Sequence, residues 1–509
     1  MRTPLRTRPH HPDRLARLGL ALLLAVVTVL PVGLVGDGRP VRAATEIRPR
    51  ITGIAPLSHE VYGYLPYWRI DSGTVDRIQY ELVSTIAIFG LGIKADGNLD
   101  TAWVGYKEYV GDDVAAITNA AHDKGVRVVP TFQMFDSGNL TKMTAFLGST
   151  AAQDRFIGQA LDLMVARKAD GANLDFEPML AAQTPAYLVF VSKFRTAMKA
   201  RSPSATLVNA TSAGAGQALV AGLVPLVDRQ MVMTYNYRWS GSTVTGAIAP
   251  LDNTTRTVKI HIARILQSAP AATILLGVPY YGYDWPVTTD VPNATVQSDK
   301  TTYGAVKSVT YANARDFLAA HPGVVWQYDA PQGSGFYTYW DATKLTWRQV
   351  YFEEARSLTA KYDYALVTDL AGVGIWTLDN DRGYPELWDL LRTKFYAPVH
   401  AVAVRASITN VTKRYGYVQA IIHYSGRNSG TVPERGTWRW TIRDARGRIR
   451  LSGTGRTETI YPGRAISHGT RVRIGLASRL PAGTYSLRVR FVRTGASWSS
   501  SVVRFRQPY

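Results

Sequence analysis

Eight short apolar segments alternate with longer stretches of helical spacing between residues 60 and 381. Two of these stretches, 111–124 and 154–168, place apolar residues every three to four positions, which is typical of amphipathic helices. Eight strands that alternate with helices predict a (β/α)8 TIM barrel of the α/β class, whose catalytic side chains come from the C-terminal ends of the strands. The candidate strands are 60–68, 84–93, 125–132, 171–178, 205–213, 230–237, 273–285 and 372–381.

Other segments flank or interrupt this barrel. The connection between the seventh and eighth strands is too long for one helix, so we expect residues 285–345 to form a small α+β insertion beside a cleft, with a companion helix at 347–362. From residue 397, short alternating runs separated by Gly, Asn and Pro predict an antiparallel β-sandwich. The predicted domains are a signal peptide (1–44), a linker (45–57), the barrel (58–396) and the sandwich (397–509).

The N-terminal segment has the layout of a secretory signal. Several Arg residues precede the apolar run 18–35, and small residues at 41–44 offer a cleavage site. The run is also long enough to span a bilayer, so retention as a membrane anchor stays an alternative, although Pro31 and Gly33 weaken a permanent helix. Because the chain has no Cys, an exported form must be stabilised by packing alone, which fits bacterial export to a secreted or wall-associated location.

The positive charge of the chain is concentrated at its two ends. The formal net charge is +20, of which residues 400–509 carry +17 and residues 1–45 carry +5, so that the barrel region is close to neutral. A solvated strand face would give the same alternation of Arg with apolar residues. We nevertheless expect the sandwich to bind anionic cell-envelope polymers or lipid head groups, and we do not expect an exported chain to bind nucleic acid.

The segment ADGANLDFEPM at 169–179 concentrates carboxylates in one apolar strand. Side chains alternate in an extended strand, so Asn173, Asp175 and Glu177 share one face while Leu174 and Phe176 point to the other. Three polar groups buried together are costly unless they form hydrogen bonds or act on something. Glu177 ends the strand, where a partly desolvated carboxyl beside a second one has a raised pKa and could protonate a leaving group near neutral pH.

The run DGANLDFE resembles the D-G-x-[DN]-x-D-x-E signature of the family 18 glycoside hydrolases, the chitinase-like enzymes. Asp170, Gly171, Asp175 and Glu177 fall on that pattern, and MTYNY at 233–237 and GIWTLDND at 374–381 resemble the sixth- and eighth-strand motifs of the family. The resemblance covers about residues 60–396 and is closest to the bacterial spore-cortex and wall-lytic N-acetylglucosaminidases. It implies a monomeric hydrolase that cleaves β-1,4 linkages of N-acetylglucosamine polymers, chitin or peptidoglycan, without a cofactor or metal.

The resemblance also assigns roles to individual residues. Glu177 becomes the general acid and later the general base, and Asp175 orients the 2-acetamido group of the substrate, with Asp170 as support for this pair. Tyr235 donates a hydrogen bond to the acetamido carbonyl, and Trp376 lies beneath the sugar whose bond is cleaved. The acetamido oxygen itself attacks the anomeric carbon, so no protein nucleophile is needed and the configuration is retained.

Two positions depart from the pattern of many family members. Asn173 and Asn236 stand where Asp is common, which removes negative charge near Asp175 and should affect the pH profile more than the type of reaction. Aromatic side chains, which suit the C–H faces of sugar rings, complete the predicted substrate site. They are Tyr64, Trp68, Phe89, Trp239, Tyr280, Tyr281, Tyr283 and Trp285.

Two other kinds of protein remain open at this point. One is a glycan-binding protein with the same fold and no catalytic activity. The departure at Asn173 is compatible with this alternative, and the presence of the acid Glu177 argues against it. The other is a wall-scaffold protein whose basic sandwich is its main function. Loop shape decides between chitin and peptidoglycan and between exo and endo cleavage, and the sequence does not settle it.

Overall fold

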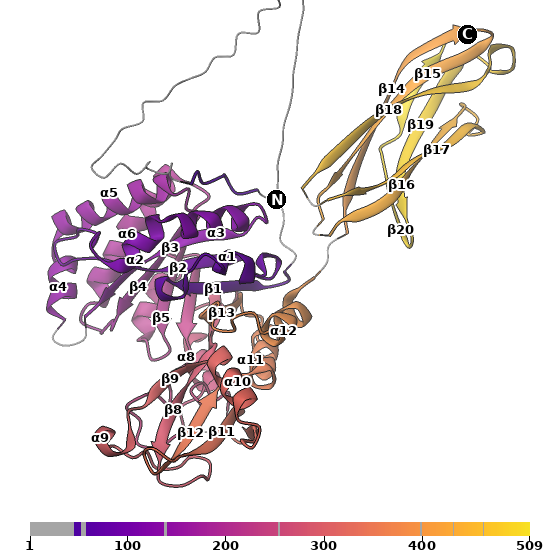
Figure 1. Cartoon of the computed structure of the whole chain (residues 1–509). Helices are drawn as coiled ribbons and strands as arrows, with labels where there is room; N and C mark the ends of the chain where they lie inside the picture. The colour runs from indigo at the N-terminus through magenta and orange to yellow at the C-terminus, as the bar shows by residue number, and fades with distance from the viewer. Residues whose placement is uncertain are drawn as a thin grey trace, which may run out of the picture. The chain divides into compact units, whose positions relative to one another are not determined.

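The computed structural model describes residues 45–51, 57–136, 140–252, 255–397, 400–430, 432–461 and 463–509. The predicted signal peptide and residues 52–56 of the predicted linker lie outside the described residues. Eight parallel strands close into a barrel in the order β1-β13-β7-β6-β5-β4-β3-β2, so the predicted barrel is confirmed (Figure 1). The strands are β1 (Glu60–Pro66), β2 (Thr85–Gly92), β3 (Arg127–Phe135), β4 (Gly171–Glu177), β5 (Thr206–Ser212), β6 (Arg229–Met233), β7 (Ile274–Pro279) and β13 (Gly372–Trp376).

Helices cover the outside of the barrel and pack on the outward residues of its strands. Phe132 of β3 packs edge-on against Phe156 of α5, and Phe176 of β4 packs against Phe190 of α6, with ring centroids 5.3 and 5.5 Å apart. The alternate residues of these strands therefore point into the barrel. The helices are α1 (Thr74–Arg77), α2 (Val104–Val110), α3 (Asp112–His122), α4 (Thr141–Leu147), α5 (Thr150–Ala166), α6 (Thr184–Arg201), α7 (Gln217–Leu223), α8 (Val258–Ile265), α11 (Ala355–Val367) and α12 (Glu386–Phe395).

The insertion between β7 and β13 is a five-stranded sheet in the order β10-β11-β12-β8-β9. The helix predicted at 347–362 is wrong in its first half, because residues 346–352 form a strand that pairs with both β8 and β11. The helix α11 begins only after Glu354, whose carboxylate accepts hydrogen bonds from the first turn in a capping box with Ser357. The elements are β8 (Tyr281–Val287), α9 (Lys300–Tyr303), β9 (Lys307–Thr310), α10 (Tyr311–Ala320), β10 (Gln327–Asp329), β11 (Ser334–Asp341) and β12 (Thr346–Phe352).

A buried ion pair ties β12 to β8. Nε of Arg348 lies 2.7 Å from Oδ1 of Asp284, and both side chains are almost fully buried. Removing one partner of such a pair leaves an uncompensated buried charge. We expect Arg348→Met to lower the free energy of unfolding by about 3–5 kcal/mol in urea titrations. The double variant Arg348→Met/Asp284→Leu should lose less than the single one, and an equal or larger loss would contradict this account.

The C-terminal domain consists of two antiparallel sheets. One contains β14-β15-β18, and the other contains β17-β16-β19-β20, with β21 also paired to β19. The predicted β-sandwich is confirmed, and its core includes Ile422, Trp438, Leu487 and Phe491. The strands are β14 (Val402–Arg414), β15 (Tyr417–Asn428), β16 (Glu434–Arg443), β17 (Ile449–Ile460), β18 (Ala465–Leu476), β19 (Gly483–Arg493), β20 (Ala496–Ser499) and β21 (Val503–Gln507). Within the described ranges, no helix is long and apolar enough to cross a membrane.

Candidate active site

The C-terminal end of β4 carries the two predicted catalytic carboxylates. Asp175 lies opposite Gln133 of β3 and Glu177 opposite Phe135, in parallel register. Phe176 points outward and packs on Tyr187 of α6, with ring centroids 5.1 Å apart. The alternation predicted for this strand therefore holds, and both carboxyl groups face the mouth of the barrel. In TIM-barrel enzymes, the active site lies at this end of the barrel.

Burial controls the protonation of both groups. Asp175 is only 3% exposed, and burial raises its pKa well above the usual range, with the charge of the nearby Glu177 raising it further. Burial also raises the pKa of Glu177. Oδ1 of Asp175 is buried and accepts no hydrogen bond from any described residue. The pair thus keeps a proton to higher pH than ordinary carboxyls do, and it offers a free acceptor to a donor group in the cavity.

Asn173 lies one layer deeper in the barrel, below Asp175 on the same face. Its Oδ1 accepts a hydrogen bond of 3.2 Å from the Tyr64 hydroxyl, and its Nδ2 donates to Oγ1 of Thr131 at 3.4 Å. The amide is completely buried and satisfied by these neutral neighbours. Asn173 therefore supports the floor of the site from below and does not line its cavity.

A cavity of about 410 Å³ opens above the carboxylates. Trp376 forms one wall, with ring centroids 4.8 Å from Phe89, 5.4 Å from Tyr64 and 6.4 Å from Trp68. The strand register explains this cluster, because Tyr64 of β1 lies directly opposite Trp376 of β13. Predicted residues that line the cavity are Tyr64, Trp68, Phe89, Asp175, Glu177, Tyr235, Asn236, Tyr281 and Trp376.

Three polar side chains, those of Tyr235, Asn236 and Tyr281, form another part of the cavity wall. The Tyr281 hydroxyl donates to Oδ1 of Asn236 at 2.6 Å, and the Tyr283 hydroxyl donates to the same atom at 3.2 Å. Burial raises the pKa of Tyr235 well above its usual range, and the charges of Glu177 and Asp175 contribute to this rise, so the hydroxyl stays a hydrogen-bond donor. The wall thus presents a neutral donor close to the two carboxylates.

Four predicted aromatic residues do not line the cavity: Tyr283, whose hydroxyl bonds to the lining residue Asn236, and three others that lie elsewhere. Trp239 is 54% exposed and does not line this cavity. Tyr280 is buried in the core, where its hydroxyl is 2.8 Å from that of Tyr362, and Trp285 is buried in the core of the insertion. Side-chain alternation along 279–285 accounts for the exclusion of Tyr280, because its neighbour Tyr281 takes the cavity side.

Asp170 lies at the opposite end of β4 from Glu177. Its carboxylate accepts hydrogen bonds from Arg50 and from the Val128 N–H, and pairs with His122. Seven residue steps of extended chain lead from Asp170 to Glu177, a distance of about 23 Å. Asp170, expected to support the catalytic pair, therefore anchors the far end of the strand and does not reach the cavity.

Several residues that line the cavity above the carboxylates were not predicted from the sequence. Phe135 and Ser212 end β3 and β5, so their position at a C-terminal strand end was a usable signal. Met231 and Met233 sit at inward positions of β6, and Ala210 lies on β5. Their small or apolar side chains carry no chemical signal of their own, so only the closed barrel brings them to the site.

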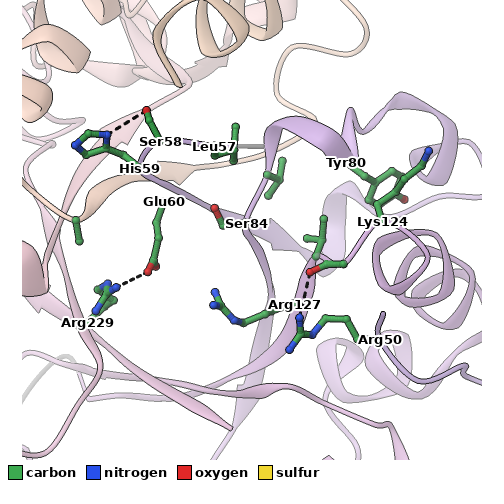
Figure 2. Close-up of a pocket in the computed structure, with 14 residues that line it drawn as sticks. Arg50, Leu57, Ser58, His59, Glu60, Tyr80, Ser84, Lys124, Arg127 and Arg229 are labelled. Atoms are coloured by element: carbon green, nitrogen blue, oxygen red, sulfur yellow. Dashed lines mark hydrogen bonds and ion pairs between the residues drawn. The ribbon is translucent and has the colours of Figure 1, made fainter. Parts of the chain in front are cut away.

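A second and larger cavity, about 460 Å³, lies at the other end of the barrel. Figure 2 shows its wall, with Arg229 paired to Glu60 on one side and Arg127 and Arg50 on the other. Glu60 is the sole acid among the described residues that line it. Because this end carries the N-terminal ends of the strands and has no carboxylate pair, the smaller cavity is the candidate active site.

Comparison with known proteins agrees with this geometry. The sequence profile of the glycosyl hydrolases family 18 matches residues 63–381. The putative sporulation-specific glycosylase YdhD of Bacillus subtilis (strain 168) is 24% identical over 338 residues, which cover 64% of this chain and 74% of that protein. The fold is shared with a family 18 chitinase from Cycas revoluta in complex with (GlcNAc)3 (TM-score 0.58, 18% identity, 66% of this chain and 99% of that one).

The fold is also shared with the spore cortex-lytic enzyme SleL of Bacillus megaterium QM B1551 (TM-score 0.54, 19% identity, 66% of this chain and 74% of that one). The resemblance to the bacterial spore and wall-lytic branch is thereby confirmed. The profile match spans more than half of the chain and includes β4 with both carboxylates. This chain is a glycoside hydrolase that belongs to family 18.

Proposed function

We propose that this enzyme cleaves β-1,4 linkages in N-acetylglucosamine polymers, peptidoglycan or chitin, with retention of configuration. The observation that supports this proposal most directly is the pairing of Asp175 and Glu177 in one cavity with the Tyr235 hydroxyl and the Trp376 ring. A carboxylate, a proton donor, a neutral hydroxyl and an aromatic wall are the groups that substrate-assisted cleavage needs.

In the proposed reaction, protonated Glu177 donates its proton to the glycosidic oxygen. The acetamido oxygen of the substrate attacks the anomeric carbon as that bond breaks, and forms a cyclic oxazolinium ion. Asp175 holds the acetamido N–H and stabilises the positive charge, while Tyr235 donates to the group's oxygen. Glu177, now ionised, removes a proton from the water that opens the ring. Two inversions at one carbon give retention.

Product analysis tests this proposal. Chitin oligomers and peptidoglycan fragments are digested in parallel, products are identified by mass spectrometry, and the anomer formed first is followed by NMR. We expect the β-anomer first, and no cleavage of an oligomer that lacks the acetyl group at the reacting sugar. Initial release of the α-anomer, or equal cleavage of the deacetylated oligomer, would contradict substrate assistance. The two digests also show which polymer is preferred.

The identity of residue 173 offers a finer test of the site. Asn173→Asp adds a buried carboxylate one layer below Asp175, which raises the pKa of both catalytic carboxyls. The general acid works while protonated, so activity is lost as pH rises through its pKa. We therefore expect the basic limb of the kcat/KM profile to move upward by about 1 pH unit. An unmoved limb in a variant with native unfolding behaviour would contradict this coupling.

We propose further that the protein is exported and that its C-terminal domain attaches it to anionic cell-envelope polymers or lipid head groups. The charge of +17 on residues 400–509 supports this proposal. Deletion of residues 397–509 should abolish sedimentation with isolated cell walls at low salt, and high salt should release the full chain. Binding that is unchanged by the deletion or by salt would contradict it.

A further inference from the structure

One outer face of the C-terminal sandwich is built around arginine. On β16 the exposed arginines alternate with the buried Trp438 and Trp440, and on β19 they alternate with Leu487, Val489 and Phe491. Because neighbouring residues of a strand point to opposite faces, all of these arginines leave the sheet on the same side. The arginine face consists of Arg435, Arg439 and Arg443 of β16, Arg488 and Arg490 of β19, and Arg504 and Arg506 of β21, all exposed.

The acids of the domain lie elsewhere and have other partners. Its three acidic residues pair as follows: Glu434 with His400 and Arg493, Asp444 with Arg448 and Arg450, and Glu458 with His468. Across the described part of the chain, no carboxylate lies within ion-pair distance of an arginine-face guanidinium. Arg439 even lies directly opposite Arg490 in the strand register. Like charges in that position destabilise a sheet, so the free protein carries an unrelieved repulsion.

The residues between the arginines restrict the chemical class of ligand that this face can bind. Thr437 and Thr441 alternate with the arginines of β16, and Ser486 lies opposite Arg504, so hydroxyl donors surround the guanidinium groups. The aromatic side chains of β16 and β19 are buried on the inner side. Among the described residues of β16 and β19, the outward positions therefore carry no ring on which a sugar or a base could stack. The large apolar side chain next to the face is Ile449 of β17, which is 54% exposed and lies opposite Arg443. Recognition rests on charge and hydrogen bonds.

Guanidinium groups with neighbouring hydroxyls suit phosphate oxygens, which accept paired hydrogen bonds from arginine. The arginines of β16 are four residues apart, about 13 Å, while adjacent strands are about 4.8 Å apart. An extended chain of phosphates can cross several of these groups at once. We propose that the arginine face binds a linear polymer of phosphate groups that carries no bases. This inference rests on the proposed attachment of the domain to the envelope and assigns it one surface and one partner.

The opposite sheet supplies a matched control. Its outer face holds Arg405, Arg427 and Arg471, which are also exposed, around a shallow groove lined by Ser425, Ser467 and Gly469. The test variant Arg439→Gln/Arg488→Gln/Arg490→Gln and the control variant Arg405→Gln/Arg427→Gln/Arg471→Gln each remove three positive charges. Any difference between them reports the position of the charges and not their number.

Binding of the full chain is measured by calorimetry at 0.1 M salt to inorganic polyphosphate, polyglutamate, duplex DNA and phosphatidylglycerol vesicles. We expect the test variant to weaken polyphosphate binding by about 100-fold and the control by less than about 3-fold. If both variants weakened polyphosphate binding equally, the net charge of the domain would explain the binding, and the assignment to the arginine face would be wrong. Equal binding of polyglutamate would overturn the preference for phosphate, and preference for vesicles or DNA would assign the face to a lipid surface or to nucleic acid instead.

Two further measurements keep the outcomes separate. Both variants should cleave chitin oligomers in solution at the wild-type rate, so loss of polyphosphate binding with intact hydrolysis concerns the face alone. Arg439→Gln alone should raise the unfolding temperature at low salt, because it removes the repulsion with Arg490. A fall in that temperature, or wild-type polyphosphate binding by the triple test variant, would overturn the proposal while leaving the proposed hydrolase intact.

Discussion

Glu177→Gln is expected to lower kcat by about 10³-fold while leaving substrate binding close to wild type. The amide fills the same space at the end of β4 but has no acidic proton for the glycosidic oxygen. The measurement is the rate of product release from chitin oligomers and peptidoglycan fragments, together with the Kd of the same oligomers. Loss of the proton donor acts on the transition state, so kcat falls while affinity persists.

The matched control for this variant is Glu46→Gln, which makes the same chemical change at a side chain that is 93% exposed. It should retain full activity. If wild type and Glu177→Gln release the same negligible amount of sugar from both polymers, the proposed reaction is wrong, whatever the affinity for glycans.

Asp175→Asn should lower kcat by about 10²- to 10³-fold, because the variant loses the negative charge that faces the developing oxazolinium ion. It should also change the pH profile. Asp175 and Glu177 are neighbouring carboxyls whose charges oppose each other, so a neutral residue 175 lets Glu177 ionise at lower pH. A general acid is active only while protonated, and the basic limb of the profile should therefore move to lower pH.

This shift is opposite in sign to the one expected for Asn173→Asp, and the two variants test one electrostatic account from both directions. The pH profiles of both variants and of the wild type are measured on the same acetylated chitin oligomers. A basic limb that moves in the same direction in both variants, or in neither, would contradict this electrostatic account.

Several parts of the structure could be predicted because short-range periodicity decides them. The alternation in residues 171–177 placed Asp175 and Glu177 on the inner face of β4 before any tertiary contact was known. Segment 346–352 shows the limit. Its β-branched and aromatic residues favour a strand, but the predicted helix extends the helical spacing that follows from residue 355 back over them, and only the pairing with β8 and β11 marks the boundary.

The composition of the cavity wall depends on long-range pairing. Tyr281 and Tyr280 are adjacent and chemically identical, yet one lines the site and the other lies in the core. Trp376 meets Tyr64 only because β13 closes the barrel against β1. In the sandwich, the polar and glycine-rich sequences of β14 and β17 resemble loops until neighbouring strands pair with them.

The anchored end of β4 bears on how this enzyme tolerates acid. Burial raises the pKa of Asp170, but hydrogen bonds from His122, the Val128 N–H and Arg50 outweigh it, and the pKa lies below its usual range. A lowered carboxyl pKa stabilises the fold above the unfolded-state value, and that stability is lost as pH falls through the folded-state value. As pH falls, the active site should therefore fail before the fold does: Asp175, whose pKa is raised, is neutralised first, and the contacts that anchor Asp170 are lost only at lower pH.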